Sequence, residues 1–178
     1  MVAQQKIEKW NAGYALLKRY VKLNFRLYFK KIYVRGKQNI PDDAPVIFAP
    51  NHQNALMDAL ALLYAVRGQP VFLARADIFK NKVLAGILTF LKLMPVYRIR
   101  DGYNSLQNNE SVLNRVNDIL AAKRGLVIFP EGNHGERKVL RPLKKGICRM
   151  ALQAEEKSNF SLGLYIVPVG LDYENYYK

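Results

Sequence analysis

The sequence has little of several features that define common protein classes. Its only cysteine, Cys148, cannot form an internal disulfide, which fits a reducing compartment. We expect no metal site, because two histidines and no cysteine pair make a poor set of zinc ligands. No serine stands in a Gly-x-Ser-x-Gly elbow, which argues against a serine hydrolase. No uncharged apolar run approaches the roughly 18 to 20 residues of a membrane-spanning helix, and no signal peptide is evident.

Acidic residues are also scarce. There are 14 Asp and Glu against 28 Lys and Arg, a formal net charge of +14. Such an excess indicates an anionic partner, either nucleic acid, a membrane surface or a phosphorylated substrate. The chain of 178 residues is one domain's worth, and half of its residues are hydrophobic, so disorder is not expected.

A long amphipathic helix is predicted near the N-terminus, from residue 6 to about residue 30. Its apolar residues follow three-four spacing and are bordered by lysines and arginines. Basic charge beside an apolar face with Trp10 and several tyrosines is typical of a helix in a lipid interface. A helix packed on its own domain or on a partner chain fits equally well. We therefore treat residues 1–31 as a basic helical segment, a candidate membrane-interface anchor, and 32–178 as the main domain.

The main domain alternates short apolar runs with helical patterns. Strands are predicted at residues 32–34, 46–49, 71–74, 95–100, 126–129 and 164–170. Helices are predicted at residues 55–66, 83–94, 105–122 and 146–157, and the very apolar 83–94 is interpreted as a core helix rather than a shallow membrane-dipping one. The alternation predicts an α/β domain with a mostly parallel central sheet covered by helices.

The loop after the predicted strand 46–49 carries a histidine and precedes an acid. His52 and Asp58 are six residues apart, so they would lie on different faces of one continuous helix. They can meet only if His52 lies in the loop and Asn54 caps the helix that follows. An imidazole held by a carboxylate at one nitrogen can accept a proton at the other. The alternative is a loop histidine without catalytic role and an acid that suits the helix dipole.

Two further strands also run into polar residues. Arg98 and Arg100 end the predicted strand 95–100, and Glu131 to Gly135 follow the strand 126–129. In parallel sheets the loops that leave the carboxyl ends of the strands form the ligand crevice. The architecture therefore predicts that these three groups meet at one edge of the sheet.

In order along the chain, four blocks resemble the glycerolipid acyltransferase family, which acylates glycerol 3-phosphate and lysophosphatidic acid. The resemblance covers about residues 32 to 171, and Pro142-Leu143-Lys144-Lys145-Gly146 is similar to the segment that the family places after its third block. The four blocks are Asn51-His52-Gln53-Asn54-Ala55-Leu56-Met57-Asp58, Val96-Tyr97-Arg98-Ile99-Arg100, Phe129-Pro130-Glu131-Gly132-Asn133-His134-Gly135 and Ile166-Val167-Pro168-Val169-Gly170-Leu171.

The resemblance implies transfer of a fatty acyl group from acyl-CoA or acyl-carrier protein to a hydroxyl of a lysophospholipid or glycerol phosphate, with no other cofactor. His52 would be the general base, and Asp58 would fix its tautomer. Substrate binding is expected from the remaining block residues and the lysines that follow: Asn51, Arg98, Arg100, Glu131, Gly132, Asn133, His134, Lys144 and Lys145.

Two departures from the family pattern leave the acceptor open. His52 and Asp58 are separated by one residue more than is usual, and Asn133-His134 stands where the family commonly has Thr-Arg. Phosphate recognition would then pass to Arg98, Arg137 or Arg141, or the acceptor is a lyso-lipid without a phosphate.

The expected partner of the basic surface is an anionic membrane and not nucleic acid, with a peripheral location on the cytoplasmic face. A non-catalytic basic module for membranes or nucleic acid would explain the charge, but not the polar residues at the strand exits. The chain ends soon after the fourth block, so we expect a truncated or minimal version of the family domain.

Overall fold

The fold is built on a parallel sheet. The computed structural model describes residues 7–97, 105–133, 135 and 139–174. The strands are β1 (Val46–Pro50), β2 (Val71–Arg75), β3 (Leu93–Val96), β4 (Leu126–Val127) and β5 (Tyr165–Val169). They lie in the order β3-β2-β4-β1-β5, and every neighbouring pair is parallel, which confirms the predicted α/β class.

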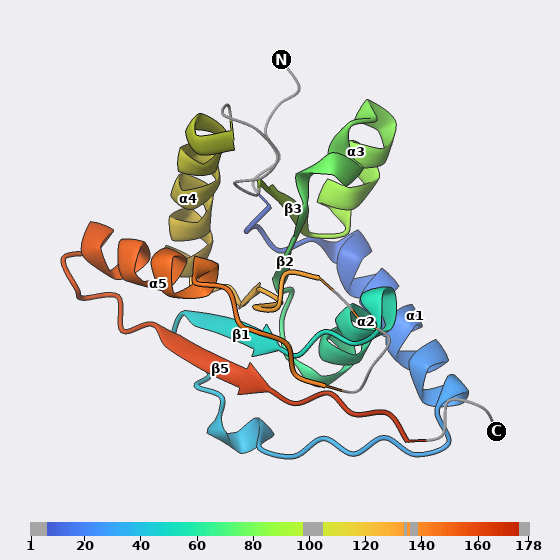
Figure 1. The fold of residues 1–178 in the computed structure, drawn as a ribbon. Coiled ribbons are helices and arrows are strands. Elements are labelled where there is room, and N and C mark those ends of the chain that lie inside the picture. The colour runs from blue at the N-terminus through green and yellow to red at the C-terminus, as the bar shows by residue number, and fades with distance from the viewer. Residues whose placement is uncertain (1–6, 98–104, 134, 136–138, 175–178) are drawn as a thin grey trace.

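Helices cover both faces of this sheet (Figure 1). They are α1 (Ala12–Tyr28), α2 (Ala55–Ala65), α3 (Lys82–Phe90), α4 (Ser105–Ala121) and α5 (Gly146–Lys157), with short 3-10 turns η1 (Lys37–Asn39) and η2 (Ala76–Phe79). Side chains of β1 alternate between two cores, as the strand period requires. Ile47 packs with residues of α4 and α5, whereas Val46 and Phe48 pack with residues of α1 and α2.

The N-terminal helix is shorter than predicted and is fastened to α2. The side chain of Asn11 caps it by accepting the N–H of Tyr14, and it ends at Phe29, whose backbone is extended. Tyr14 and Phe25 are buried, and Lys18 donates to the carbonyls of Val66 and Gly68 at the end of α2, at 3.0 and 2.6 Å. One face of α1 thus packs on its own domain, while other apolar side chains of α1 stay exposed: Leu16, Tyr20, Leu23 and Leu27.

Two predicted elements are wrong. Residues 32–34 form no strand, because this apolar run is not part of the core: Tyr33 is 76% and Val34 45% exposed. The predicted core helix 83–94 divides at Lys92, where φ is +63°, so α3 ends at Phe90 and Leu93 begins β3. No side chain of α3 is buried, whereas Met94 on β3 is 1% exposed.

Candidate active site

The loop between β1 and α2 places His52 over the first turn of α2. Its Nδ1 lies 3.0 Å from Oδ2 of Asp58, which is fully buried. The extra loop residue is accommodated because the backbone N–H groups of Gln53 and Asn54 also donate to this oxygen, at 2.8 and 2.7 Å. Asn54 is the N-cap residue by position, but its side chain makes no capping bond. The Asp58 carboxylate therefore joins the loop to the first turn of α2 and accepts the N–H groups of the two residues that precede the helix.

Hydrogen bonds keep Asp58 ionised in spite of its burial. Burial acts to raise the pKa of this carboxyl, but donors at His52, Asn54 and Tyr173 outweigh it and hold the pKa below its usual value. The Tyr173 hydroxyl donates to Oδ1 at 2.8 Å. Because an ionised carboxylate only accepts hydrogen bonds, the proton in the contact sits on Nδ1 of His52. The lone pair is then on Nε2, the arrangement that general-base chemistry needs.

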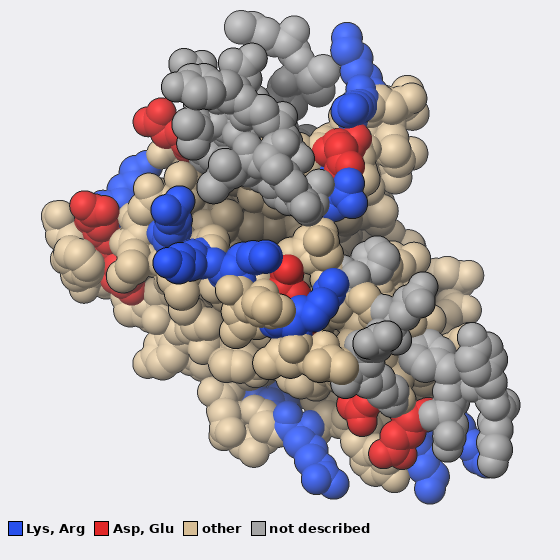
Figure 2. Space-filling model, viewed as in Figure 1, with Lys and Arg blue, Asp and Glu red and all other residues tan. Residues whose placement is uncertain are grey.

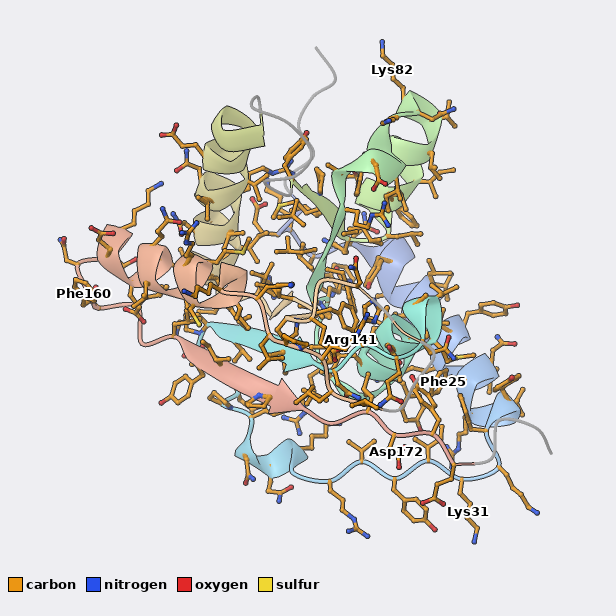
Figure 3. The ribbon with its side chains drawn as sticks, viewed as in Figure 1. Phe25, Lys31, Lys82, Arg141, Phe160 and Asp172 are labelled. Carbon is orange, nitrogen blue, oxygen red and sulfur yellow. The ribbon has the colours of Figure 1, made fainter. Side chains whose placement is uncertain are left out.

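A second charged pair holds the backbone of His52. Glu131, just beyond β4, accepts the His52 N–H through Oε1 at 2.9 Å, and its Oε2 accepts from Nε of Arg141 at 2.9 Å. Arg141 also donates to the carbonyl of His52 at 3.1 Å. It lies between the carboxyl end of β1 and α2 (Figure 3). The ring of Phe129 stacks on the imidazole with centroids 4.0 Å apart. The exits of β1 and β4 thus meet, as the sequence predicted.

The turn after β4 brings the lysine segment alongside. Gly132 has φ +72°, the left-handed region that favours glycine, and its N–H donates to the carbonyl of Phe129 at 3.0 Å. The N–H of Lys144 donates to the carbonyl of Pro130 at 2.7 Å. A Cβ on Gly132 would meet Lys144 Cγ at an ordinary 3.6 Å, so the turn needs glycine for its conformation and not for space.

The other predicted site residues fall into three groups. The Asn51 side chain bonds to Leu171, through both its amide nitrogen and its oxygen. Asn133, Lys144 and Lys145 are exposed. Figures 2 and 3 show the same face of the molecule, and Lys and Arg side chains cross its middle, where Arg141 is labelled. The last group lies outside the described residues: Arg98, Arg100, His134 and Arg137.

Sequence reasoning missed two contacts of the His52–Asp58 pair. Tyr173 follows the fourth block by two residues, and Phe129 reads as the end of a buried strand. Neither position carries a local signal, because each contact depends on how distant segments pack together. Within the described residues, no group of three or more His, Cys, Asp and Glu could hold a metal ion. Among the same residues, no helix has the length and hydropathy to cross a bilayer.

The chain is similar to proteins of a known family. The model of the Acyltransferase family matches residues 31–172. The chain belongs to the acyltransferase family. It is 27% identical over 159 residues to the 1-acyl-sn-glycerol-3-phosphate acyltransferase of Borreliella burgdorferi, covering 89% of this chain and 58% of that protein. Against the human 1-acyl-sn-glycerol-3-phosphate acyltransferase alpha it is 27% identical over 154 residues, covering 85% of this chain and 49% of that protein.

The fold has a solved counterpart. The crystal structure of the 1-acyl-sn-glycerophosphate acyltransferase PlsC from Thermotoga maritima aligns with a TM-score of 0.61 at 21% identity. The alignment covers 87% of this chain and 55% of that one. This likeness shows the shared fold. The chain spans about half the length of the relatives it matches.

Proposed function

We propose that this protein transfers a fatty acyl group from a thioester, acyl-CoA or acyl-carrier protein, to the hydroxyl of 1-acylglycerol 3-phosphate. The observation that carries the proposal is the His52 imidazole, held by buried Asp58 and lying at a strand exit beside Glu131. The family and the names of the relatives support this class of reaction.

In this mechanism His52 acts as general base. Nε2 takes the proton of the acceptor hydroxyl. At the same time the hydroxyl oxygen attacks the thioester carbonyl carbon and forms a C–O bond. The C–S bond then breaks, and the departing thiolate accepts the proton from the imidazolium of His52. Asp58 stabilises the imidazolium through Nδ1, 3.0 Å away. A positioned base of this kind typically contributes about 10² to 10⁴ in rate.

The acceptor's phosphate is assigned to cations on the same side of the molecule. Arg141 is already engaged with Glu131 and the carbonyl of His52, so we assign it to support of the loop. Lys144 and Lys145 are exposed beside the Pro130 turn and are proposed to meet the phosphate of the acceptor or of CoA. Roles for Arg98, Arg100, Asn133 and His134 remain predictions from the family resemblance.

A screen of donors and acceptors tests the reaction. Purified protein is incubated with acyl-CoA or acyl-carrier protein and with lysophosphatidic acid, glycerol 3-phosphate or lyso-lipids without a phosphate monoester, and the products are identified by mass spectrometry. Phosphatidic acid from lysophosphatidic acid is the expected product. Transfer only to acceptors without a phosphate would support the alternative that the changed Asn133-His134 block selects another lyso-lipid. Vesicle binding with no transfer from either donor would favour the non-catalytic module.

We further propose that the protein works at the cytoplasmic surface of an anionic membrane, through α1. The exposed apolar side chains of this helix are Leu16 (70%), Tyr20 (64%), Leu23 (58%) and Leu27 (76%). A groove of about 440 Å³ is lined by one of them, Leu23, and by the cations Lys22, Arg26 and Lys37. Apolar side chains bordered by cations suit an anionic lipid interface.

A pair of leucine substitutions tests the membrane proposal. Leu23→Glu on α1 is expected to weaken cosedimentation with phosphatidylglycerol vesicles about tenfold, because it places a carboxylate in the apolar contact. Leu152→Glu is the matched control, since Leu152 is 63% exposed on α5, on the other face of the sheet. Equal binding of the two variants would contradict a role for α1.

A further inference from the structure

The segment that follows β5 returns to the His52 loop. The Asn51 side chain donates to the carbonyl of Leu171 at 2.9 Å and accepts its N–H at 2.6 Å. The backbone N–H of Asn51 donates to the carbonyl of Val169 at 3.2 Å. The two bonds to Leu171 join residues 120 positions apart, and all three fix the segment beside the loop. The chain that continues from Leu171 is thereby directed toward α2.

Tyr173 is the next buried residue on this segment. It is 8% exposed, and its hydroxyl donates to Oδ1 of the fully buried Asp58 at 2.8 Å. Its ring lies 6.2 Å from that of Phe29, the residue at which α1 ends. Tyr173 therefore fills the space between the end of α1 and the first turn of α2, with its polar end on the catalytic carboxylate.

The two oxygens of Asp58 have different partners. Oδ2 meets the imidazole of His52 and the N–H groups of Gln53 and Asn54, whereas Oδ1 receives the Tyr173 hydroxyl. Three of the four contacts thus fall on Oδ2, and the Tyr173 hydroxyl is the contact of Oδ1. Without the hydroxyl, Oδ1 would be buried without that donor, and the carboxylate plane would lose the contact that opposes its rotation.

We propose that Tyr173 is a positioning residue for the acyl transfer. It holds Asp58 by Oδ1 so that Oδ2 stays directed at Nδ1 of His52. Asn51 supports this arrangement by setting the course of the segment that carries Tyr173. The inference rests on the proposed function, because it names the residue that orients the catalytic pair.

Loss of the Tyr173 hydroxyl has a defined electrostatic consequence. Among the described residues, charged groups bonded to the His52 backbone or to Tyr173 are Glu131 and Arg141, from the segment after β4, and Asp172, whose Oδ1 accepts the N–H of Tyr173 at 2.9 Å. Removing the hydroxyl leaves these in place and takes one donor from the ionised form of Asp58. Without that contact Oδ2 can turn away from Nδ1, so the carboxylate stabilises the imidazolium of His52 less. The imidazole would then lose its proton at lower pH, so the acid limb of kcat/KM moves downward.

The test compares Tyr173→Phe with Tyr165→Phe, in which the same hydroxyl is removed from a side chain that is 53% exposed on β5. For Tyr173→Phe we expect kcat to fall about tenfold with KM nearly unchanged, and the acid limb to shift downward. Tyr165→Phe should match wild type. A kcat within about twofold of wild type and an unmoved acid limb would overturn the proposal. Failure of Tyr173→Phe to fold would also overturn it, since the proposed role is local to Asp58.

A double-mutant cycle separates positioning from general support. If Tyr173 acts through Asp58, Tyr173→Phe should have little further effect in an Asp58→Asn background, whereas a merely structural role costs the same factor in both backgrounds.

A readout without substrate separates this inference from the proposed function. Histidine NMR, with the His52 signal assigned by its loss in His52→Ala, should show a lower imidazole pKa in Tyr173→Phe than in wild type. An unchanged value contradicts the positioning role even where transfer is found. A shifted value with no transfer from any donor would instead leave Tyr173 coupled to the pair and refute the proposed function.

Discussion

Asp58 on α2 and Lys18 on α1 are buried charges on two helices that cover the same face of the sheet, but their surroundings differ. Asp58 accepts from two backbone N–H groups, a tyrosine and the imidazole, and these donors keep its pKa low in spite of burial. Lys18 donates to two carbonyls, and burial, with Lys22 and Lys37 nearby, lowers its pKa to about 8. The surroundings of Asp58 thus favour its charged form, which the proposed chemistry needs. The surroundings of Lys18, which only attaches α1 to the end of α2, disfavour its charged form.

The largest expected difference between the two is in catalysis. Asp58→Asn should lower kcat by about 10² to 10⁴, because an amide cannot fix the imidazole tautomer or stabilise the imidazolium. Lys18→Met should keep kcat within a few-fold of wild type, because Lys18 contacts only the end of α2. Steady-state kinetics measure both. A loss in Lys18→Met as large as that in Asp58→Asn would break the comparison.

A smaller effect is expected from the pair that holds the His52 backbone. Arg141→Lys keeps the positive charge but cannot contact Glu131 and the His52 carbonyl together, so kcat should fall about tenfold. Arg67→Lys is the matched control, because its bond to Asp42 joins side chains that are 73% and 78% exposed. Thermal melting and kinetics of the control should match wild type, as exposed pairs contribute little. Equal kinetics for the two variants would remove Arg141 from the site.

The sequence predicted those parts of the site that are encoded locally. Val46–Pro50 and Gly146–Lys157 form the expected strand and helix because their apolar patterns agree with their burial. The His52–Asp58 contact could be anticipated because a loop placement was the only way for the two to meet. Tyr173 could not, since it reaches Asp58 across 115 positions, and only the packing of β5 beside β1 brings them together. The apolar run 83–94 was misread because nothing local marks Lys92 as the break.

The smallest effect is a difference in pH dependence of stability. The folded pKa of Lys18, about 8, lies below the ordinary 10.5, so the unfolded chain binds the proton more strongly and stability rises as pH increases above 8. Between pH 8 and 10 the gain should be about 2 kcal/mol. The pKa of Tyr14 is raised by burial to about 12, which acts in the opposite direction only above pH 10. Urea unfolding of wild type and Lys18→Met measures the difference, and equal slopes would contradict the burial argument.

Asp58 gives a slope of the same sign in the acid range, because its folded pKa is also lowered. Its folded pKa lies below the ordinary value of 3.8, so its contribution to stability is present above that pH and is lost as pH falls through the folded pKa. Acid unfolding of wild type should therefore be steeper than that of Asp58→Asn. Identical acid transitions would mean that the donors around the carboxylate do not favour its ionised form.

The proposed acyl transfer depends most on the imidazole of His52 as the base. The direct measurement is mass-spectrometric detection of phosphatidic acid formed from lysophosphatidic acid and acyl-CoA by wild type and by His52→Ala, both shown to be folded. We predict steady formation by wild type and a rate at least about 10² lower for the variant. Equal rates in the two proteins would contradict the account.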